Sequence, residues 1–234
     1  NVFIGGSLEW ASDDYLFYVT VDEKQRPYQL FRHRLGERND TLIFEETDEA
    51  FYLHVFKSDS AAYLFASSSS LDTSEILYLR TDQPTAAWRV FAPRTKGVEY
   101  KLEHHNEHFL ITTNETAPNF KLLSTPVHHI EREHWLEHFP QNDDVLLDGV
   151  AVFEGHWLLH GRKKGLTHLW AYDVRSGLTR SVRFPEKVYT THVYSNHVFH
   201  SAKAFITYES MVTPFSVLEL DLNTLETTLV QRKP

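Results

Sequence analysis

The residues with the greatest potential for chemistry lie between His128 and Phe139, in the stretch HHIEREHWLEHF. Within it, His134 to His138 matches the H-x-x-E-H pattern of one group of zinc peptidases. If this segment is a helix, the two histidines lie one turn apart and can bind one Zn²⁺ ion together. The secondary structure of the segment therefore decides whether the chain carries the site of a metal-dependent hydrolase.

Other catalytic patterns are missing from the sequence. It has no G-x-S-x-G nucleophile elbow and no glycine-rich phosphate loop. It has no cysteine, which excludes disulfides, thiolate metal ligands and a cysteine nucleophile. Ser210 has no neighbouring residue that marks it as a nucleophile, and a serine at a strand end or turn is the simpler interpretation. We therefore expect no catalytic residue, no cofactor site and no metal site.

Five similar units follow one another along the chain. Each contains a short run of apolar and aromatic residues, and the runs are spaced 48, 46, 48 and 48 residues apart, starting at Tyr15, Tyr63, Phe109, Trp157 and Phe205. Two further runs follow each of these after gaps that carry Gly, Asp, Asn, Ser and Pro, which are turn signals. A candidate innermost strand precedes each first run except in the first unit, where it is incomplete. Four strands in about 47 residues is the period of a β-propeller.

We therefore predict an all-β chain that forms part of a β-propeller of four-stranded antiparallel blades. About five blades are expected, at residues 1–50, 51–97, 98–147, 148–187 and 188–234. Phe and Tyr, with 16 and 11 residues, favour strands, and no 11-residue window shows the 3.6-residue period of a helix. A single β-sandwich is the alternative, but it does not require equal spacing between like-positioned runs.

The repeat also answers the question about the histidines. It places His134–Pro140 in the outermost strand of the third blade, where residues four apart are separated by about 13 Å. His134 and His138 cannot both reach one ion from such a strand. The pairs His104-His105 and His128-His129 are no better, because adjacent strand residues point to opposite faces. A metal site formed between strands stays open as an alternative.

Net charge and hydropathy indicate which classes of partner are not expected. The net charge of −9 disfavours nucleic acid, since phosphate binding needs a basic face. No apolar run approaches the roughly 20 residues of a membrane span, so no membrane partner is expected. The amino-terminal NVFIGGSLEW lacks signal-peptide features and an initiator Met, so we expect a piece of a longer protein. A cytoplasmic location fits a chain without cysteine.

Several segments resemble the propeller of the oligopeptidase B (protease II) branch of the prolyl oligopeptidase family of serine peptidases. The resemblance runs through nearly the whole chain in order. It is carried by Pro27–Gly36, Glu45–Ser58, Thr73–Leu79, Glu99–Leu122, Arg162–Leu169 and Ser210–Thr224.

The resemblance implies a fold and a role. Members of this family combine a seven-bladed propeller with an α/β-hydrolase domain that carries a Ser-Asp-His triad, and the oligopeptidase B branch cleaves short peptides after Arg or Lys. The propeller caps the active site as a lid and size filter. This chain resembles only the later blades, so no triad residue maps onto it and we expect it to be inactive alone. The implied partners are a C-terminal hydrolase domain of the same parent chain and, through the parent, short basic peptides.

If the blades surround a channel, their innermost strands line it. Which face of each strand points inward is not decided by the sequence. The candidate lining residues are His54, Tyr100, Leu102, His104, Thr190 and His192.

Two other functions stay open. The chain could be a free-standing propeller that binds a protein or peptide, or a metal-dependent hydrolase built on the histidines. A seven-bladed ring needs roughly 330 residues, so this chain is two blades short and forms either an open arc or a tight ring of five. An open arc would expose two apolar blade faces, which predicts self-association.

Overall fold

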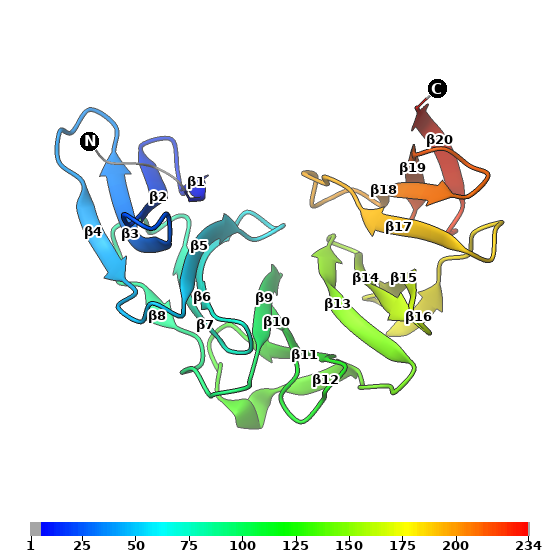
Figure 1. The fold of residues 1–234 in the computed structure, drawn as a ribbon, viewed down its shortest axis with the longest axis horizontal. Helices are drawn as coiled ribbons and strands as arrows, with labels where there is room; N and C mark the ends of the chain where they lie inside the picture. Colours follow the sequence, from blue (N-terminus) through cyan, green and yellow to red (C-terminus); the bar gives the residue numbers. More distant parts are fainter. Residues whose placement is uncertain (1–5, 234) are drawn as a thin grey trace. The chain divides into compact units, whose positions relative to one another are not determined.

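The computed structural model describes residues 6–233 of the chain. Within them, 20 β-strands form five four-stranded antiparallel sheets (Figure 1). In every sheet the strands lie side by side in chain order, so each strand is hydrogen-bonded to its neighbours in sequence. This confirms the predicted all-β fold of four-stranded blades.

Two sheets precede residue 100. The first consists of β1 (Leu8–Trp10), β2 (Tyr15–Val21), β3 (Pro27–Arg34) and β4 (Thr41–Glu45). The second consists of β5 (Tyr52–Lys57), β6 (Tyr63–Ser69), β7 (Ser74–Arg80) and β8 (Arg89–Val90).

Three sheets follow. The third consists of β9 (Tyr100–His105), β10 (His108–Thr113), β11 (Lys121–Pro126) and β12 (Leu136–Phe139). The fourth consists of β13 (Val145–Val152), β14 (His156–Lys163), β15 (Leu166–Asp173) and β16 (Leu178–Ser181). The fifth consists of β17 (Tyr189–Val193), β18 (Lys203–Ser210), β19 (Ser216–Asp221) and β20 (Thr227–Arg232).

Three segments differ in detail from the predicted strands. The third apolar run of the second repeat lies at residues 87–93, and of these residues only Arg89–Val90 pair as a strand. The segment expected as a strand from His134 begins with the 3-10 helix η1 (Arg132–His134), and β12 starts at Leu136. The strand β13 begins at Val145, ahead of the boundary predicted at residue 148, because Val145 and Leu147 already alternate as buried residues of that strand.

The chain divides into two compact units between Leu102 and Glu103. In the first unit, an apolar cluster joins the first and second sheets. It includes Phe17, Leu30, Val55 and Leu64, all nearly inaccessible to solvent. Because two sheets bury their facing side chains against each other, this cluster supplies the main hydrophobic stabilisation of the unit.

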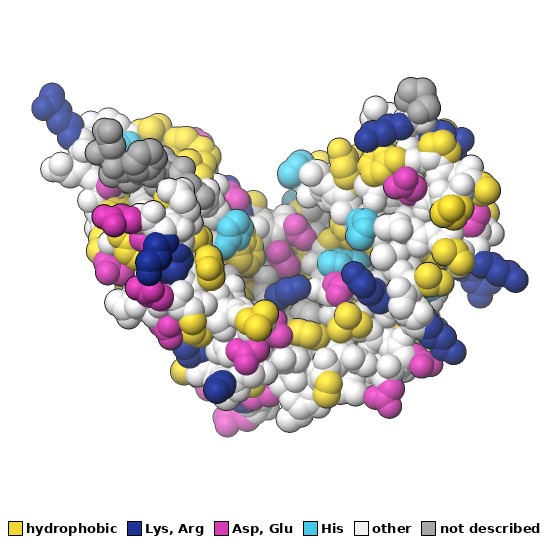
Figure 2. Space-filling view, in the orientation of Figure 1, with side chains coloured by type: hydrophobic (Ala, Val, Ile, Leu, Met, Phe, Trp, Pro, Cys, Tyr) yellow, Lys and Arg dark blue, Asp and Glu magenta, His cyan; other side chains and the backbone are white. Residues whose placement is uncertain are grey.

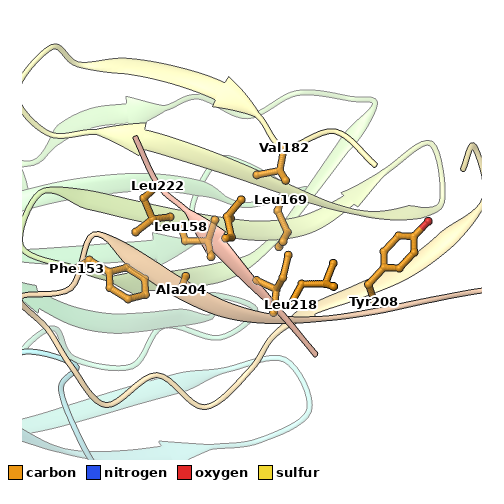
Figure 3. Packing of buried hydrophobic residues seen from close by; sticks show 10 residues of the cluster. Phe153, Leu158, Leu169, Val182, Ala204, Tyr208, Leu218 and Leu222 are labelled. Atoms are coloured by element: carbon orange, nitrogen blue, oxygen red, sulfur yellow. The ribbon is translucent and has the colours of Figure 1, made fainter. Parts of the chain in front are cut away.

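The second unit has two such clusters. One joins the third and fourth sheets and includes Leu110, Leu122, Leu159 and Trp170. The other joins the fourth and fifth sheets, and Figure 3 shows its side chains packed between the strands. Its labelled members are Phe153, Leu158, Leu169, Val182, Ala204, Tyr208, Leu218 and Leu222.

Gly161 in β14 lies where two backbones approach unusually closely. The pairing of β13 with β14 shifts register between Leu147 and Gly149. A Cβ atom on residue 161 would lie 2.1 Å from the carbonyl oxygen of Leu146, a distance that no carbon atom tolerates. Only glycine therefore fits at this position without movement of the strand.

None of the helices in the described part of the chain has the length and apolar character needed to cross a membrane.

Candidate functional site

The first strands of the second and fifth sheets, β5 and β17, alternate between buried and exposed side chains. In β5, Leu53 and Val55 are buried while Tyr52 and His54 are exposed, as the two-residue period of a strand requires. In β17, Thr191 is buried while Thr190 and His192 are exposed. These exposed positions are the ones that can meet a ligand.

The six predicted lining residues therefore fall into two groups. His54, Thr190 and His192 are exposed, and a lining role for them stays a prediction. Tyr100, Leu102 and His104 are buried, so they do not belong to an exposed face. They share one side of β9, and that apolar side packs into the protein interior.

Tyr100 illustrates why this face is inaccessible. Its hydroxyl donates to the carbonyl oxygen of Ala92 at 2.7 Å and accepts from the backbone N–H of Ile76 at 2.8 Å. Its own backbone N–H donates to Ser74 at 2.7 Å. Tyr100 is thus a structural residue that fixes the segment after β8, and Lys101 is the exposed neighbour on the other face of β9.

A pocket of about 510 Å³ in the second unit contains two of the exposed candidates, Thr190 and His192. It lies where β17 begins and β18 ends, and Arg162 and Glu209 also line it. Thr190 is the direct cross-strand partner of Glu209. The pocket thus offers a carboxylate for a cationic group and a guanidinium for an anionic one, which suits the ends and side chains of a peptide.

A second pocket of about 440 Å³ gathers aromatic and histidine side chains of the third and fourth sheets. Trp157 and Tyr172 stack with ring centroids 4.5 Å apart. His138 meets the Trp157 ring edge-on at 5.0 Å. Its two ring nitrogens share hydrogen bonds with the hydroxyls of Ser124, at 2.8 Å, and Tyr172, at 3.1 Å.

Two histidines of this pocket, His105 and His138, have lowered pKa values. Burial lowers the pKa of His138, and the nearby His108 adds to the effect. Burial also lowers the pKa of His105, although its Nε2–H donates to the carbonyl oxygen of Glu154 at 2.8 Å. Because His138 is turned into this pocket, its ring nitrogens are occupied by hydroxyl groups rather than directed at His134.

The H-x-x-E-H pair therefore does not form a shared ligand set. The group in the described residues that could hold a metal ion is His129, Glu131 and His134, and it does not include His138. His134 takes part through the turn of η1, not through a strand as the sequence predicted. The rings of His129 and His134 lie 5.1 Å apart.

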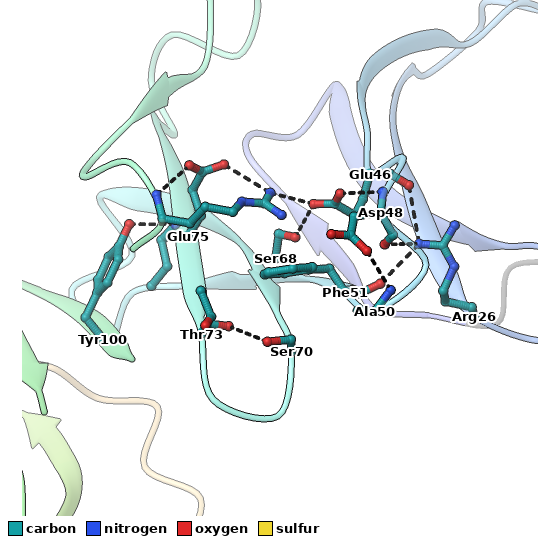
Figure 4. Close-up of polar contacts among 12 residues, drawn as sticks. Arg26, Glu46, Asp48, Ala50, Phe51, Ser68, Ser70, Thr73, Glu75 and Tyr100 are labelled. Atoms are coloured by element: carbon teal, nitrogen blue, oxygen red, sulfur yellow. Dashed lines mark hydrogen bonds and ion pairs between the residues drawn. The ribbon is translucent and has the colours of Figure 1, made fainter. Parts of the chain in front are cut away.

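An ionic cluster in the first unit was not predicted from the sequence (Figure 4). Arg94 binds the carboxylates of Glu46, at 2.7 Å, and Glu75, at 3.2 Å. Its guanidinium also lies 4.0 Å from the centre of the Phe51 ring. Ser68 donates to the same carboxylate of Glu46, which is 4% exposed.

This cluster joins the ends of successive sheets. Burial by itself raises the pKa of Glu46, but hydrogen bonds from Arg94, Ser68 and the backbone N–H of Asp48 outweigh it and lower the pKa overall. Glu46 follows β4 and Arg94 follows β8, so the two occupy equivalent places one repeat apart. An alignment of the five repeats in the sequence would have placed Glu46 and Arg94 at equivalent positions, which is the signal that could have indicated this pair. We interpret the cluster as structural, because its carboxylates are already paired.

The face shown in Figure 2 carries side chains of both charges. On the face shown in Figure 2, Lys and Arg side chains are interspersed with Asp and Glu. On this face, the described residues present no continuous basic surface of the kind that nucleic acid requires.

Repeated four-stranded antiparallel sheets joined face to face by apolar clusters define the blades of a β-propeller domain. The chain belongs to the family of the prolyl oligopeptidase N-terminal β-propeller domain, whose sequence pattern matches residues 2–233. This confirms the resemblance found in the sequence.

Curated relatives and solved structures agree with this family. The chain is 39% identical over 237 aligned residues to "Protease 2" of Moraxella lacunata, covering all of this chain and 34% of that protein. It superimposes on oligopeptidase B of Trypanosoma brucei with a TM-score of 0.91 and 27% identity, covering 97% of this chain and 34% of that one. Oligopeptidase B of Leishmania major gives a TM-score of 0.90 and 27% identity, covering 98% and 34%. The chain thus spans about a third of the length of these relatives.

Proposed function

We propose that this chain is the non-catalytic propeller portion of a serine oligopeptidase that cleaves short peptides after Arg or Lys. In this proposal it partners a C-terminal α/β-hydrolase domain of the same parent protein. The propeller acts as a lid and size filter over the active site, and the parent works in the cytoplasm. The triad lies in the partner domain, and none of its residues maps onto this chain.

The observation that carries the proposal is the match of nearly the whole chain to one third of longer peptidases. The matched third is the N-terminal propeller domain of that family. The names "Protease 2" and "Oligopeptidase B" of its relatives support a peptidase as the parent. A domain that accounts for one third of such a chain and offers no nucleophile motif supports a role in access rather than in bond cleavage.

The chemistry of the exposed strand faces supports passage of peptides. His54, Thr190 and His192 offer hydrogen-bonding groups instead of a continuous apolar surface. In the pocket at the start of β17, Glu209 can pair with a cationic side chain and Arg162 with a carboxylate. Closure of such a domain over a catalytic site excludes water and large substrates while it admits flexible chains.

The size filter is tested by presenting one Arg-containing sequence to the parent peptidase in three forms: a short chromogenic substrate, a peptide of about 30 residues, and a loop of a folded protein. We expect kcat/KM to fall along the series and cleavage of the folded form to be undetectable. Equal rates for the short and folded forms would contradict the proposal.

A variant makes the test specific to the propeller. Thr190→Trp adds bulk at an exposed position of the innermost strand β17, whereas Thr179→Trp adds the same bulk at an exposed position of the outermost strand β16. We expect Thr190→Trp to reduce kcat/KM for the long peptide more than for the short substrate. Thr179→Trp serves as the control and should change neither.

Self-association of the isolated chain is also part of the proposal. Every residue of β20 is exposed, including Leu229 and Val230. In the first sheet, Leu8 and Trp10 are more than a third exposed. Sedimentation velocity should show concentration-dependent association together with binding of a hydrophobic dye. A clean monomer that binds no dye would count against it.

A further inference from the structure

We propose that the turn between β11 and β12 is a surface binding site for a divalent transition-metal ion such as Zn²⁺, formed by His129, Glu131 and His134. One ligand atom from each of these residues lies within 4.8 Å of the other two. Two imidazoles and one carboxylate form a donor set that zinc uses in proteins, with water in the remaining position. The site is separate from the pockets described above.

The geometry needs only a small adjustment. Ligand atoms around a tetrahedral zinc ion lie about 3.4 Å apart, given bonds of about 2.0–2.1 Å. The three side chains are exposed, so rotation about their side-chain torsions can close the difference without displacing packed neighbours.

The backbone of the turn is held in place before any ion binds. The hydroxyl of Thr125 donates to the carbonyl oxygen of His129. The indole N–H of Trp135 donates to the carbonyl oxygen of Ile130 at 2.9 Å. The backbone N–H of His134 donates to Glu131 at 2.9 Å, which closes the turn of η1. A fixed turn lowers the entropy lost on binding, because the three ligands already lie on one short loop.

The positive charge in this turn is engaged by another carboxylate. Arg132 binds both oxygens of Glu115, at 3.0 and 3.1 Å, and lies over the ring of Trp135. Glu133 lies 3.7 Å from Nε2 of His134 and adds negative charge close to the site. Both features favour a cation at the three ligands.

The experiment is titration of the tag-free chain with ZnCl₂ by isothermal calorimetry at pH 7.5. We expect one site, and we expect either His129→Ala or His134→Ala to weaken binding about tenfold or more, because each removes one of the three ligands. Glu131→Gln should weaken it less, since the amide oxygen remains a poor ligand. Absorption of bound Co²⁺ in the visible range reports direct coordination.

His128→Ala is the matched control. His128 is also exposed and adjacent to the site, but it faces Glu107 at 3.8 Å and is not one of the three ligands. It should bind Zn²⁺ as the unaltered chain does. If His129→Ala and His134→Ala also retain that affinity, or if His128→Ala loses as much, the proposal is wrong. Circular dichroism without metal checks that each variant keeps its fold.

Discussion

The two units of the chain join their sheets in chemically different ways. In the first unit, Arg94 and Glu46 add an ionic contact to the apolar cluster between the first and second sheets. In the second unit, His138 and Trp157 add an aromatic contact, without a formal charge pair, to the cluster between the third and fourth sheets. The same sheet architecture therefore accepts, as its polar component, either a partly buried ion pair or a partly buried imidazole whose pKa is lowered.

We call each packed contact between two successive sheets a junction. The difference indicates which perturbation should destabilise each junction most. A buried charge is costly once its partner is removed, whereas a buried neutral histidine is costly once it is protonated. The first junction should therefore respond most to mutation of one partner. The second should respond most to mild acid.

The largest effect is expected from Arg94→Met. This change leaves the 4%-exposed Glu46 without its cation. Loss of one partner of a buried pair typically costs about 3–5 kcal/mol, and we expect about 3 here because Ser68 and the N–H of Asp48 still bind the carboxylate. Urea unfolding measures the loss. Adding Glu46→Gln to this variant should recover part of it, and a double variant no more stable than the single one would contradict the ionic interpretation.

The next effect is a difference in pH response. Burial lowers the pKa of His105, His138, His156 and His168, all of which lie in the second unit. As the pH falls, these histidines are therefore protonated in the unfolded chain before they are protonated in the folded one. The free energy of unfolding decreases as the pH drops below the ordinary histidine pKa of about 6.5. Glu46 has a lowered carboxyl pKa, and its contribution is lost only in more acidic solution, below about 4.5.

Hydrogen exchange at pH 7, 6 and 5, corrected for intrinsic rates, tests this order. Peptides from β14 and β15 should lose protection before peptides from β6 and β7. Loss of protection at the same pH in both units would contradict the proposed difference between the two junctions.

A smaller effect is expected from His138→Phe. Phenylalanine keeps a ring against Trp157 and Tyr172 but loses the two hydrogen bonds to hydroxyl groups. We expect a loss of about 1–2 kcal/mol at pH 7 and a weaker decline in stability between pH 6.5 and 5. His128→Phe, at an exposed position, controls for the added aromatic ring and should leave the urea midpoint unchanged. An unchanged acid response in His138→Phe would assign that response to the other histidines.

The smallest effect should follow Lys24→Met. Lys24 and Glu49 form an ion pair of 2.9 Å, but both side chains are about three-quarters exposed. Solvent screens such pairs, so the urea midpoint should not move measurably. A loss comparable with that of Arg94→Met would show that exposure does not explain the difference between these two ion pairs.

The fold was largely predictable because its signals are local. The equally spaced runs starting at Tyr15, Tyr63 and Trp157 are β2, β6 and β14. Strand ends were less predictable. Trp88 turns into the apolar cluster instead of extending β8, and the turn at Arg132–His134 interrupts a run that looked continuous.

The site was less predictable because it depends on contacts between distant residues. Burial on one side of β9 removed Tyr100, Leu102 and His104 from the exposed faces, and neighbouring sheets determine that burial. The approach of His129 to His134 depends on a 3-10 turn within a segment predicted as a strand. His138 shares a hydrogen bond with Tyr172, 34 residues later in the chain, because their sheets pack together.

The order of the strands has a consequence for synthesis of the protein. Because the strands of every described sheet are consecutive in the chain, a sheet can pair fully as soon as its fourth strand has left the ribosome. The junction between two sheets forms later, because Glu46 can bind Arg94 only after the following sheet has emerged. A nascent chain stopped between sheets should hold ordered hydrogen bonds but unprotected apolar faces, which is the form that a chaperone would recognise.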